Sequence, residues 1–172
     1  MKKLQVLAIC LSVLVALCTA RGAAPAGAAS SEKNISGTLT INDQKIDLVY
    51  AYVDESDADE PIVVLSDKPL PADAIPFIPE KFIKEQKVHA IAFSVSSKDK
   101  KLTNTYGMLS NPSEWPQVGI GRVEEGKTTL TVTRLDADMI EGKIATPKPV
   151  KLPYISYSFD LSFKAEVDKS RK

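Results

Sequence analysis

Apolar and polar side chains alternate without a break along the C-terminal part of the chain, from Tyr154 to Val167. Successive side chains of a β-strand point to opposite faces, so this pattern predicts one strand with a buried face and a wet face. At roughly 3.3 Å per residue the strand would be about 45 Å long, so we expect a bend or a bulge in it. The buried face would carry Ile155, Tyr157, Phe159, Leu161, Phe163, Ala165 and Val167.

The same alternation runs from Ile35 to Ile41 near the other end of the chain. Asn42-Asp43-Gln44 follows it, and Asn and Asp tolerate the positive φ angles that tight turns need. After this turn, the segment from Ile46 to Val53 is predicted to be a return strand with apolar side chains on both faces. Residues 34–53 are therefore predicted to form a β-hairpin whose second strand is covered on both sides.

Further short apolar runs, separated by polar turns, follow at regular intervals. They predict strands at 62–66, 88–96, 102–109, 118–123, 128–135 and 139–145. Many short strands with turn residues between them are typical of antiparallel all-β domains. We therefore predict an all-β fold, an antiparallel β-sandwich, with a closed β-barrel as the alternative.

One segment interrupts this rhythm, because Pro71, Pro76 and Pro79 cannot donate a hydrogen bond within a central strand. Proline is favoured in the first turn of a helix, and an acidic residue follows Pro79 where the helix dipole is positive. The sequence thus predicts one short helix near residues 79–86. It would cover an end of the β-structure with Phe77, Phe82 and Ile83.

The N-terminal segment has the layout of a secretory signal peptide. Two lysines give a positive start, an apolar run extends from Leu4 to Ala20, and small residues follow. The apolar run is shorter than the roughly 20 residues that span a bilayer. We expect a signal peptide and flexible leader at 1–29, a single all-β domain at 34–168 and a polar tail at 169–172. Cleavage could follow Ala20, Ala26, Ala28 or Ala29.

A lipoprotein attached through Cys18 is the alternative to a periplasmic or secreted protein. A bacterial lipobox needs a small residue before the cysteine, and Leu17 is not small. We therefore expect an exported domain without a transmembrane span. Because both cysteines, Cys10 and Cys18, lie in the leader, we also expect no disulfide in the mature domain.

The net charge of the mature chain bears on whether nucleic acid or anionic lipid could be its partner. Removal of residues 1–29 takes away three basic side chains and no acidic one, so the mature chain has 19 basic and 22 acidic side chains, a net charge of −3. A nucleic-acid-binding domain usually carries a basic patch, and binding to anionic lipid is likewise driven by basic residues. We expect no nucleic-acid partner and no electrostatic attraction of the whole domain to a membrane.

The acidic run from Asp54 to Glu60 is the candidate for a metal site. Its carboxylates Asp54, Asp57 and Asp59 could ligate Ca²⁺. An EF-hand loop, however, needs a glycine and a later glutamate at positions where this chain does not have them. A solvated loop whose charges discourage edge pairing is the favoured interpretation.

No recognised catalytic or cofactor-binding motif occurs in the sequence, so we expect no catalytic residue and no cofactor. His89, the single histidine, is predicted to be an ordinary strand residue, because no partner for a general base is indicated. Trp115 lies in a loop bounded by Pro112 and Pro116. It would either cover a sheet end, which we favour, or anchor a binding partner.

Several strand and turn segments resemble those of uncharacterised exported bacterial β-domain proteins. They are residues 37–42 with 48–52, 64–70, 140–142 and 159–165. The resemblance implies a small periplasmic or secreted β-domain, and it assigns no activity and no functional residue.

These observations together favour a non-enzymatic domain that binds or scaffolds another component of the cell envelope or the extracellular space. The alternative is a carrier of an apolar small molecule inside a β-barrel. Such a cavity would be lined by the aromatic side chains Tyr50, Tyr52, Phe93, Tyr157, Phe159 and Phe163.

Overall fold

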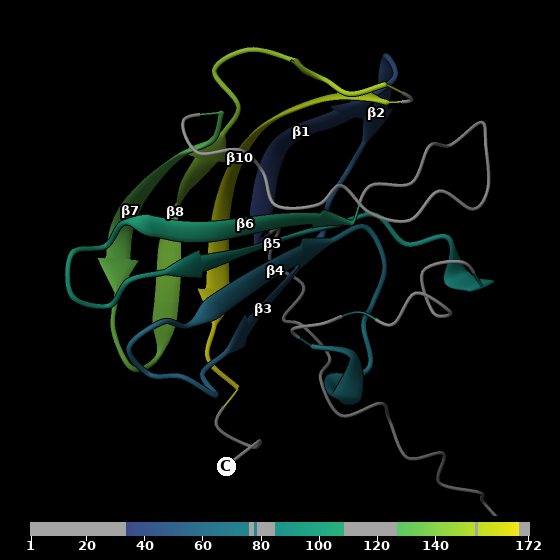
Figure 1. The fold of residues 1–172 in the computed structure, drawn as a ribbon. Coiled ribbons are helices and arrows are strands. Elements are labelled where there is room, and N and C mark those ends of the chain that lie inside the picture. The colour runs from purple at the N-terminus through teal and green to yellow at the C-terminus, as the bar shows by residue number, and fades with distance from the viewer. Residues whose placement is uncertain (1–33, 76–77, 79–84, 109–126, 154, 169–172) are drawn as a thin grey trace, which may run out of the picture.

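The computed structural model describes residues 34–75, 78, 85–108, 127–153 and 155–168 (Figure 1). Its strands form two antiparallel sheets that pack face to face, with the strands of one sheet running across those of the other. The sheets are not closed into a barrel. The predicted all-β sandwich is therefore confirmed, and the barrel alternative is wrong.

The first sheet has the strand order β2-β1-β10-β8-β7, and β9 pairs with β10 beside this path. Its strands are β1 (Ile35–Ile41), β2 (Gln44–Ile46), β7 (Thr129–Leu135), β8 (Met139–Ala145), β9 (Val150–Lys151) and β10 (Ser156–Glu166). The second sheet has the order β3-β4-β5-β6. Its strands are β3 (Tyr50–Asp54), β4 (Ile62–Ser66), β5 (Ala90–Val95) and β6 (Leu102–Met108).

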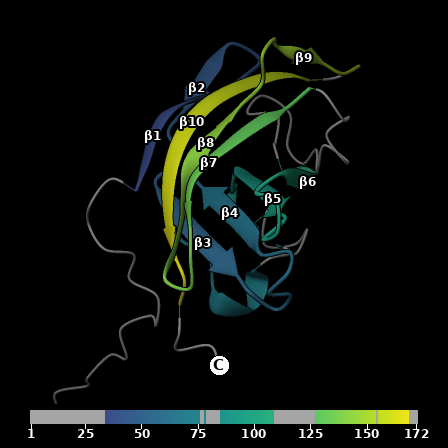
Figure 2. The same cartoon turned by 90° about the vertical axis from the view of Figure 1, so that its left-hand side faces the viewer.

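Strand β10 is the centre of the first sheet. It pairs with β1 along one edge and with β8 and β9 along the other, and it curves along its length (Figure 2). The face predicted to be buried carries Tyr157, Phe159, Leu161, Phe163 and Ala165, each no more than 3 % exposed. The alternation in the sequence thus identified the core face of this strand correctly.

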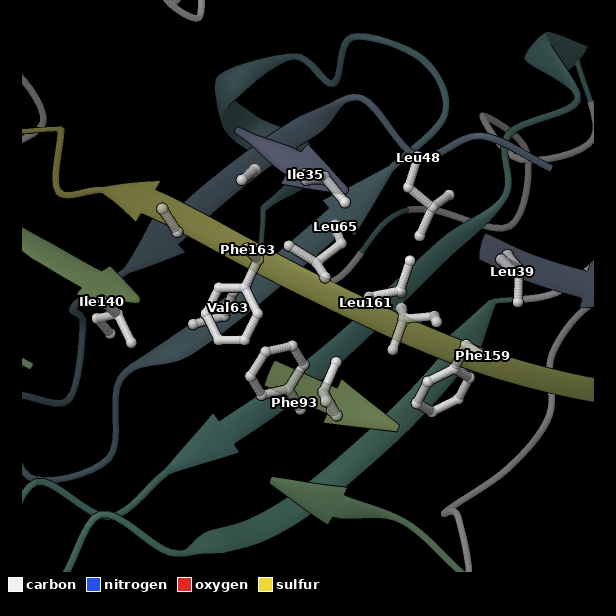
Figure 3. Close-up of a cluster of buried hydrophobic side chains, with 14 of the residues drawn as sticks. Ile35, Leu39, Leu48, Val63, Leu65, Phe93, Ile140, Phe159, Leu161 and Phe163 are labelled. Carbon is white, nitrogen blue, oxygen red and sulfur yellow. The ribbon is translucent and has the colours of Figure 1, made fainter. Parts of the chain in front are cut away.

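The core lies between the two sheets. Phe163 of β10 meets Phe93 of β5 edge to face, with ring centroids 5.2 Å apart, and aliphatic side chains from both sheets surround this pair (Figure 3). An edge-to-face pair combines the burial of two large rings with a favourable quadrupole contact. It joins the middle strand of one sheet to an inner strand of the other.

The predicted hairpin over 34–53 is correct only in its first half. Asn42 and Asp43 have positive φ angles and connect β1 to β2. The chain then leaves the first sheet, and β3 pairs with β4 in the second sheet. The pattern gave no sign of this crossing, because strands of both sheets bury one face in the same core.

The outer face of the second sheet is also covered, by the segment between β4 and β5. Leu70, Ile78 and Val88 pack there with Tyr52 of β3, and the Leu70 N–H donates to the Tyr52 Oη at 2.9 Å. This packing explains why β3 is apolar on both faces, as predicted. The same segment contains a 3₁₀ helix, η1 (Ala72–Ala74).

Other predicted elements differ in outcome. Residues 79–84 of the predicted helix, with Phe77, lie outside the described residues, and Glu85 and Gln86 are helical. The predicted strand at 118–123 also lies outside them, and β9 was not predicted. Within the described ranges, no helix is long and apolar enough to cross a membrane.

The packing of β10 gives a direct test of the core. Replacing Phe163 by Ala should lower the free energy of unfolding by about 3–5 kcal/mol, because it removes a buried ring and leaves a cavity beside Phe93. Ser162→Ala, at the neighbouring exposed position, should change it by less than about 1 kcal/mol. Urea unfolding of both variants measures the difference, and a larger loss for Ser162→Ala would contradict the assigned face.

Candidate functional site

The single histidine forms a structural pair with an aspartate. His89 and Asp67 extend the pairing of β4 with β5 by one residue beyond Ser66 and Ala90, and the Asp67 N–H donates to the His89 carbonyl at 3.1 Å. Asp67 accepts the His89 N–H on Oδ1, and its Oδ2 lies 2.8 Å from the imidazole Nδ1. The two side chains are only 12 % and 14 % exposed. Asp67 and His89 thus join the two ends of the segment between β4 and β5, which covers the outer face of the second sheet.

This pair is poorly placed for proton transfer to a substrate. The second ring nitrogen of His89, Nε2, is buried from solvent. A general base has to reach the proton that it removes, directly or through a single water molecule. The prediction that His89 is a strand residue is close to the structure, although β5 begins one residue later, at Ala90.

Two carboxylates of the acidic loop, those of Asp54 and Asp57, stabilise the loop's own backbone. Asp54 accepts hydrogen bonds from the N–H and the hydroxyl of Ser56, and Asp57 accepts the N–H of Asp59. Such contacts two residues apart are typical of Asx turns. No group of three His, Cys, Asp or Glu side chains that could hold a metal ion occurs within the part of the chain that the structure describes.

Displaced pKa values are found in exposed turns. The guanidinium of Arg134 and the backbone N–H of Asp138 hold the pKa of Asp136 below its usual value, and Asp136 raises the pKa of Arg134 in return. The Ser96 hydroxyl lowers the pKa of Asp99. Strongly displaced pKa values can mark functional sites when they occur in clefts. These carboxylates stabilise the β7–β8 and β5–β6 turns instead.

The most distinctive surface feature begins where β8 ends. Thr146 pairs with Phe159 of β10, through its N–H to the carbonyl at 2.9 Å and through Oγ1, which accepts the Phe159 N–H at 3.1 Å. The chain returns to β10 at Val150, opposite Tyr157. Between these two pairings, the chain from β8 to β9 has three residues, 147–149, whereas β10 has only Ser158. The three residues therefore bulge out of the sheet.

This Pro-Lys-Pro arch, residues 147–149, is rigid for local reasons. The rings of Pro147 and Pro149 fix φ, and neither residue has an N–H that needs a partner. Val150 anchors the far end, since its side chain is only 6 % exposed. Lys148 is exposed at the middle of the arch, on the connection from β8 to β9, two strands that can be followed in Figure 2.

Two more lysines lie beside the arch. Thr129 pairs with Ala145, and the same register continued by two residues places Lys127 opposite Pro147. Lys151 follows the buried Val150 in β9, so its side chain points away from the core. Neither sequence pattern nor motif had singled out these lysines. For Lys127 the available signal was the pairing of the predicted strands at 128–135 and 139–145, because this residue directly precedes the first of them.

Together these residues line a groove of about 590 Å³, called the basic groove below. Its described lining consists of Lys127, Pro147, Lys148, Pro149, Val150 and Lys151. It therefore combines positive charge with apolar carbon and includes no acidic side chain among these residues. Neither Lys148 nor Lys151 forms an ion pair with a carboxylate of the described ranges. Its volume is in the range of small-molecule sites, roughly 300–1,000 Å³.

The remaining candidates do not converge on a second site. Trp115 lies outside the described residues. The aromatic side chains proposed for a carrier cavity are divided between two places, because Tyr50 and Tyr52 pack on the outer face of the second sheet. Phe93, Tyr157, Phe159 and Phe163 lie in the core between the sheets.

The Asp67–His89 pair yields a prediction about stability. Asp67→Ala should lower the free energy of unfolding by about 1–3 kcal/mol, because it leaves the half-buried N–H and imidazole of His89 without their acceptor. Asp47→Ala, at an exposed position, should change it by less than about 0.5 kcal/mol. Thermal and urea unfolding of both variants provide the measurement, and equal stabilities would argue against the pair as a fold-stabilising contact.

Comparison of the chain with protein families, with curated proteins and with solved structures finds no match. The fold and the basic groove therefore rest on the geometry of this chain alone.

Proposed function

We propose that this protein is exported and that its sandwich is a non-enzymatic binding domain of the cell envelope, with the basic groove as its binding site. The observation that carries the proposal is the groove itself, in which three lysines surround a hollow of about 590 Å³. The proposal of export rests on the cationic start and the apolar run of residues 4–20.

The framework of the groove favours binding. Thr146 and Val150 fix both ends of the arch on β10, so the backbone at Lys148 is in place before any ligand arrives. A site that is already in its bound shape loses less conformational entropy when the ligand binds. Binding therefore has to order only the lysine side chains, because the backbone that carries them is already in place.

The rest of the described surface points toward recognition by charge. Val49, at 43 % exposed, is the one exposed large hydrophobic residue among the described positions. Protein-binding surfaces commonly present a contiguous apolar patch of several hundred Å². A single valine does not make such a patch, so the groove, not an apolar face, is the better candidate for contact with a partner.

A non-enzymatic role agrees with how the potential catalytic groups are used. The imidazole of His89 is tied to Asp67 at the base of a covering segment. In the acidic loop, the carboxylates of Asp54 and Asp57 accept backbone N–H groups. These groups have structural partners, and none lies among the described residues that line the basic groove.

Affinity capture tests the proposal. The exported form, purified from cells that express the full chain, is used to capture envelope components, which are identified by mass spectrometry. The double variant Lys148→Glu/Lys151→Glu should reduce recovery of the specific component by at least about tenfold, since two attractive charges become repulsive. The matched variant Lys98→Glu/Lys164→Glu, at exposed positions elsewhere, should leave recovery unchanged.

Two results would overturn the proposal. If both double variants recovered the same components at the same level, the basic groove would not be the binding site. If the protein stayed in the cytoplasm with residues 1–29 intact, the proposed export would be wrong.

A further inference from the structure

We infer that the ligand of the basic groove is a single-chain amphiphile with a phosphate headgroup. This inference rests on the proposed function, because it names the chemistry of the partner that the same groove would hold. It follows from the two kinds of surface that meet there and from the size of the hollow.

The charged part of the groove suits a phosphate. Lys127, Lys148 and Lys151 line one hollow, and no described acidic residue lines it with them. Lysine binds phosphate as a point charge, without the flat two-pronged geometry that arginine offers to carboxylates. Several ammonium groups around one hollow match the charge of a phosphate monoester better than that of a singly charged carboxylate.

The uncharged part of the groove suits a hydrocarbon chain. Pro147, Pro149 and Val150 contribute carbon surface to the same hollow, and the lysine side chains add their methylene stems. A purely inorganic anion would leave this carbon surface exposed to water. An alkyl chain next to the headgroup would cover it and would itself be removed from water, which favours binding.

The size of the hollow favours one molecule over an extended surface. About 590 Å³ accommodates a small ligand, whereas docking onto a bilayer depends on a broad basic or amphipathic face. The outer face of the first sheet, next to the groove, does not provide one. It presents hydroxyl side chains such as Ser162 and Thr131, and Lys143 there is paired with Asp160.

The net charge of −3 does not conflict with this inference. Charges farther apart than about 10 Å are largely screened at ordinary ionic strength, so a ligand in the groove responds mainly to the lysines around it. The acidic loop at Asp54–Glu60 belongs to the connection between β3 and β4 of the other sheet. The overall charge predicts a weak, screened repulsion of a phosphate anion at long range, and the basic groove supplies a local attraction.

Isothermal titration calorimetry of the exported form with monomeric dodecyl phosphate tests the inference. We expect saturable one-to-one binding that weakens as salt is raised. Inorganic phosphate and the neutral detergent dodecyl maltoside should each bind at least about tenfold more weakly, because each provides only half of the contacts. Lys148→Gln/Lys151→Gln should weaken dodecyl phosphate by at least about tenfold, and Lys98→Gln/Lys164→Gln should not.

Three results would overturn the inference. Inorganic phosphate binding as tightly as dodecyl phosphate would show that the carbon surface contributes nothing. Equal affinities of the two glutamine variants, with unchanged thermal unfolding, would place the ligand elsewhere. Binding to phosphatidylglycerol vesicles without binding to monomeric dodecyl phosphate would indicate a membrane surface in place of a single amphiphile.

The outcome also separates the inference from the proposed function. If dodecyl phosphate fails to bind while capture of an envelope component still depends on Lys148 and Lys151, the chemistry of the ligand is wrong and the binding role stands. If both fail, the groove is not the site, and both statements fall together.

Discussion

Burial of the apolar face of β10 against the second sheet is the contact on which the rest of this structure depends. Phe159, Leu161 and Phe163 are almost completely buried there, and the edge-to-face contact of Phe163 with Phe93 joins the two sheets at their centre. The same strand holds β1 along one edge and both β8 and β9 along the other. Because the domain is expected to have no disulfide, this packing and pairing must supply its stability.

The basic groove forms because two strands, β8 and β9, pair with successive parts of β10. Strands β8 and β9 follow one another along the same edge of β10, and the chain between them has more residues than that edge can pair with. The excess leaves the sheet as the Pro-Lys-Pro arch, with Thr146 and Val150 fixed at its ends. A rigid framework that carries a local irregularity is a common way to build a binding site. Here the irregularity presents Lys148 beside Lys151.

The two sheets differ in how their outer faces are used. The outer face of the second sheet is covered by the segment between β4 and β5, which Asp67 and His89 hold at its base. The outer face of the first sheet carries polar side chains in register, such as Ser36 beside Ser162. The groove lies at one end of this polar sheet, on the connections that join its strands. Structural polar contacts and the proposed binding contacts therefore belong to different parts of the molecule.

The sequence alone determined most of the local structure and little of the site. Strict alternation identified the buried face of β10, and short apolar runs gave β4 and β8 with their observed bounds, because period-two burial is a local property of a strand. The crossing from β2 to β3, the pairing of Asp67 with His89 and the groove were decided by the tertiary structure. Each depends on which strands become neighbours, and alternation is the same in either sheet. Lys127 and Lys151 are brought to one hollow only after β7 has paired with β8 and both β8 and β9 have paired with β10. No pattern around either lysine indicates that they become neighbours.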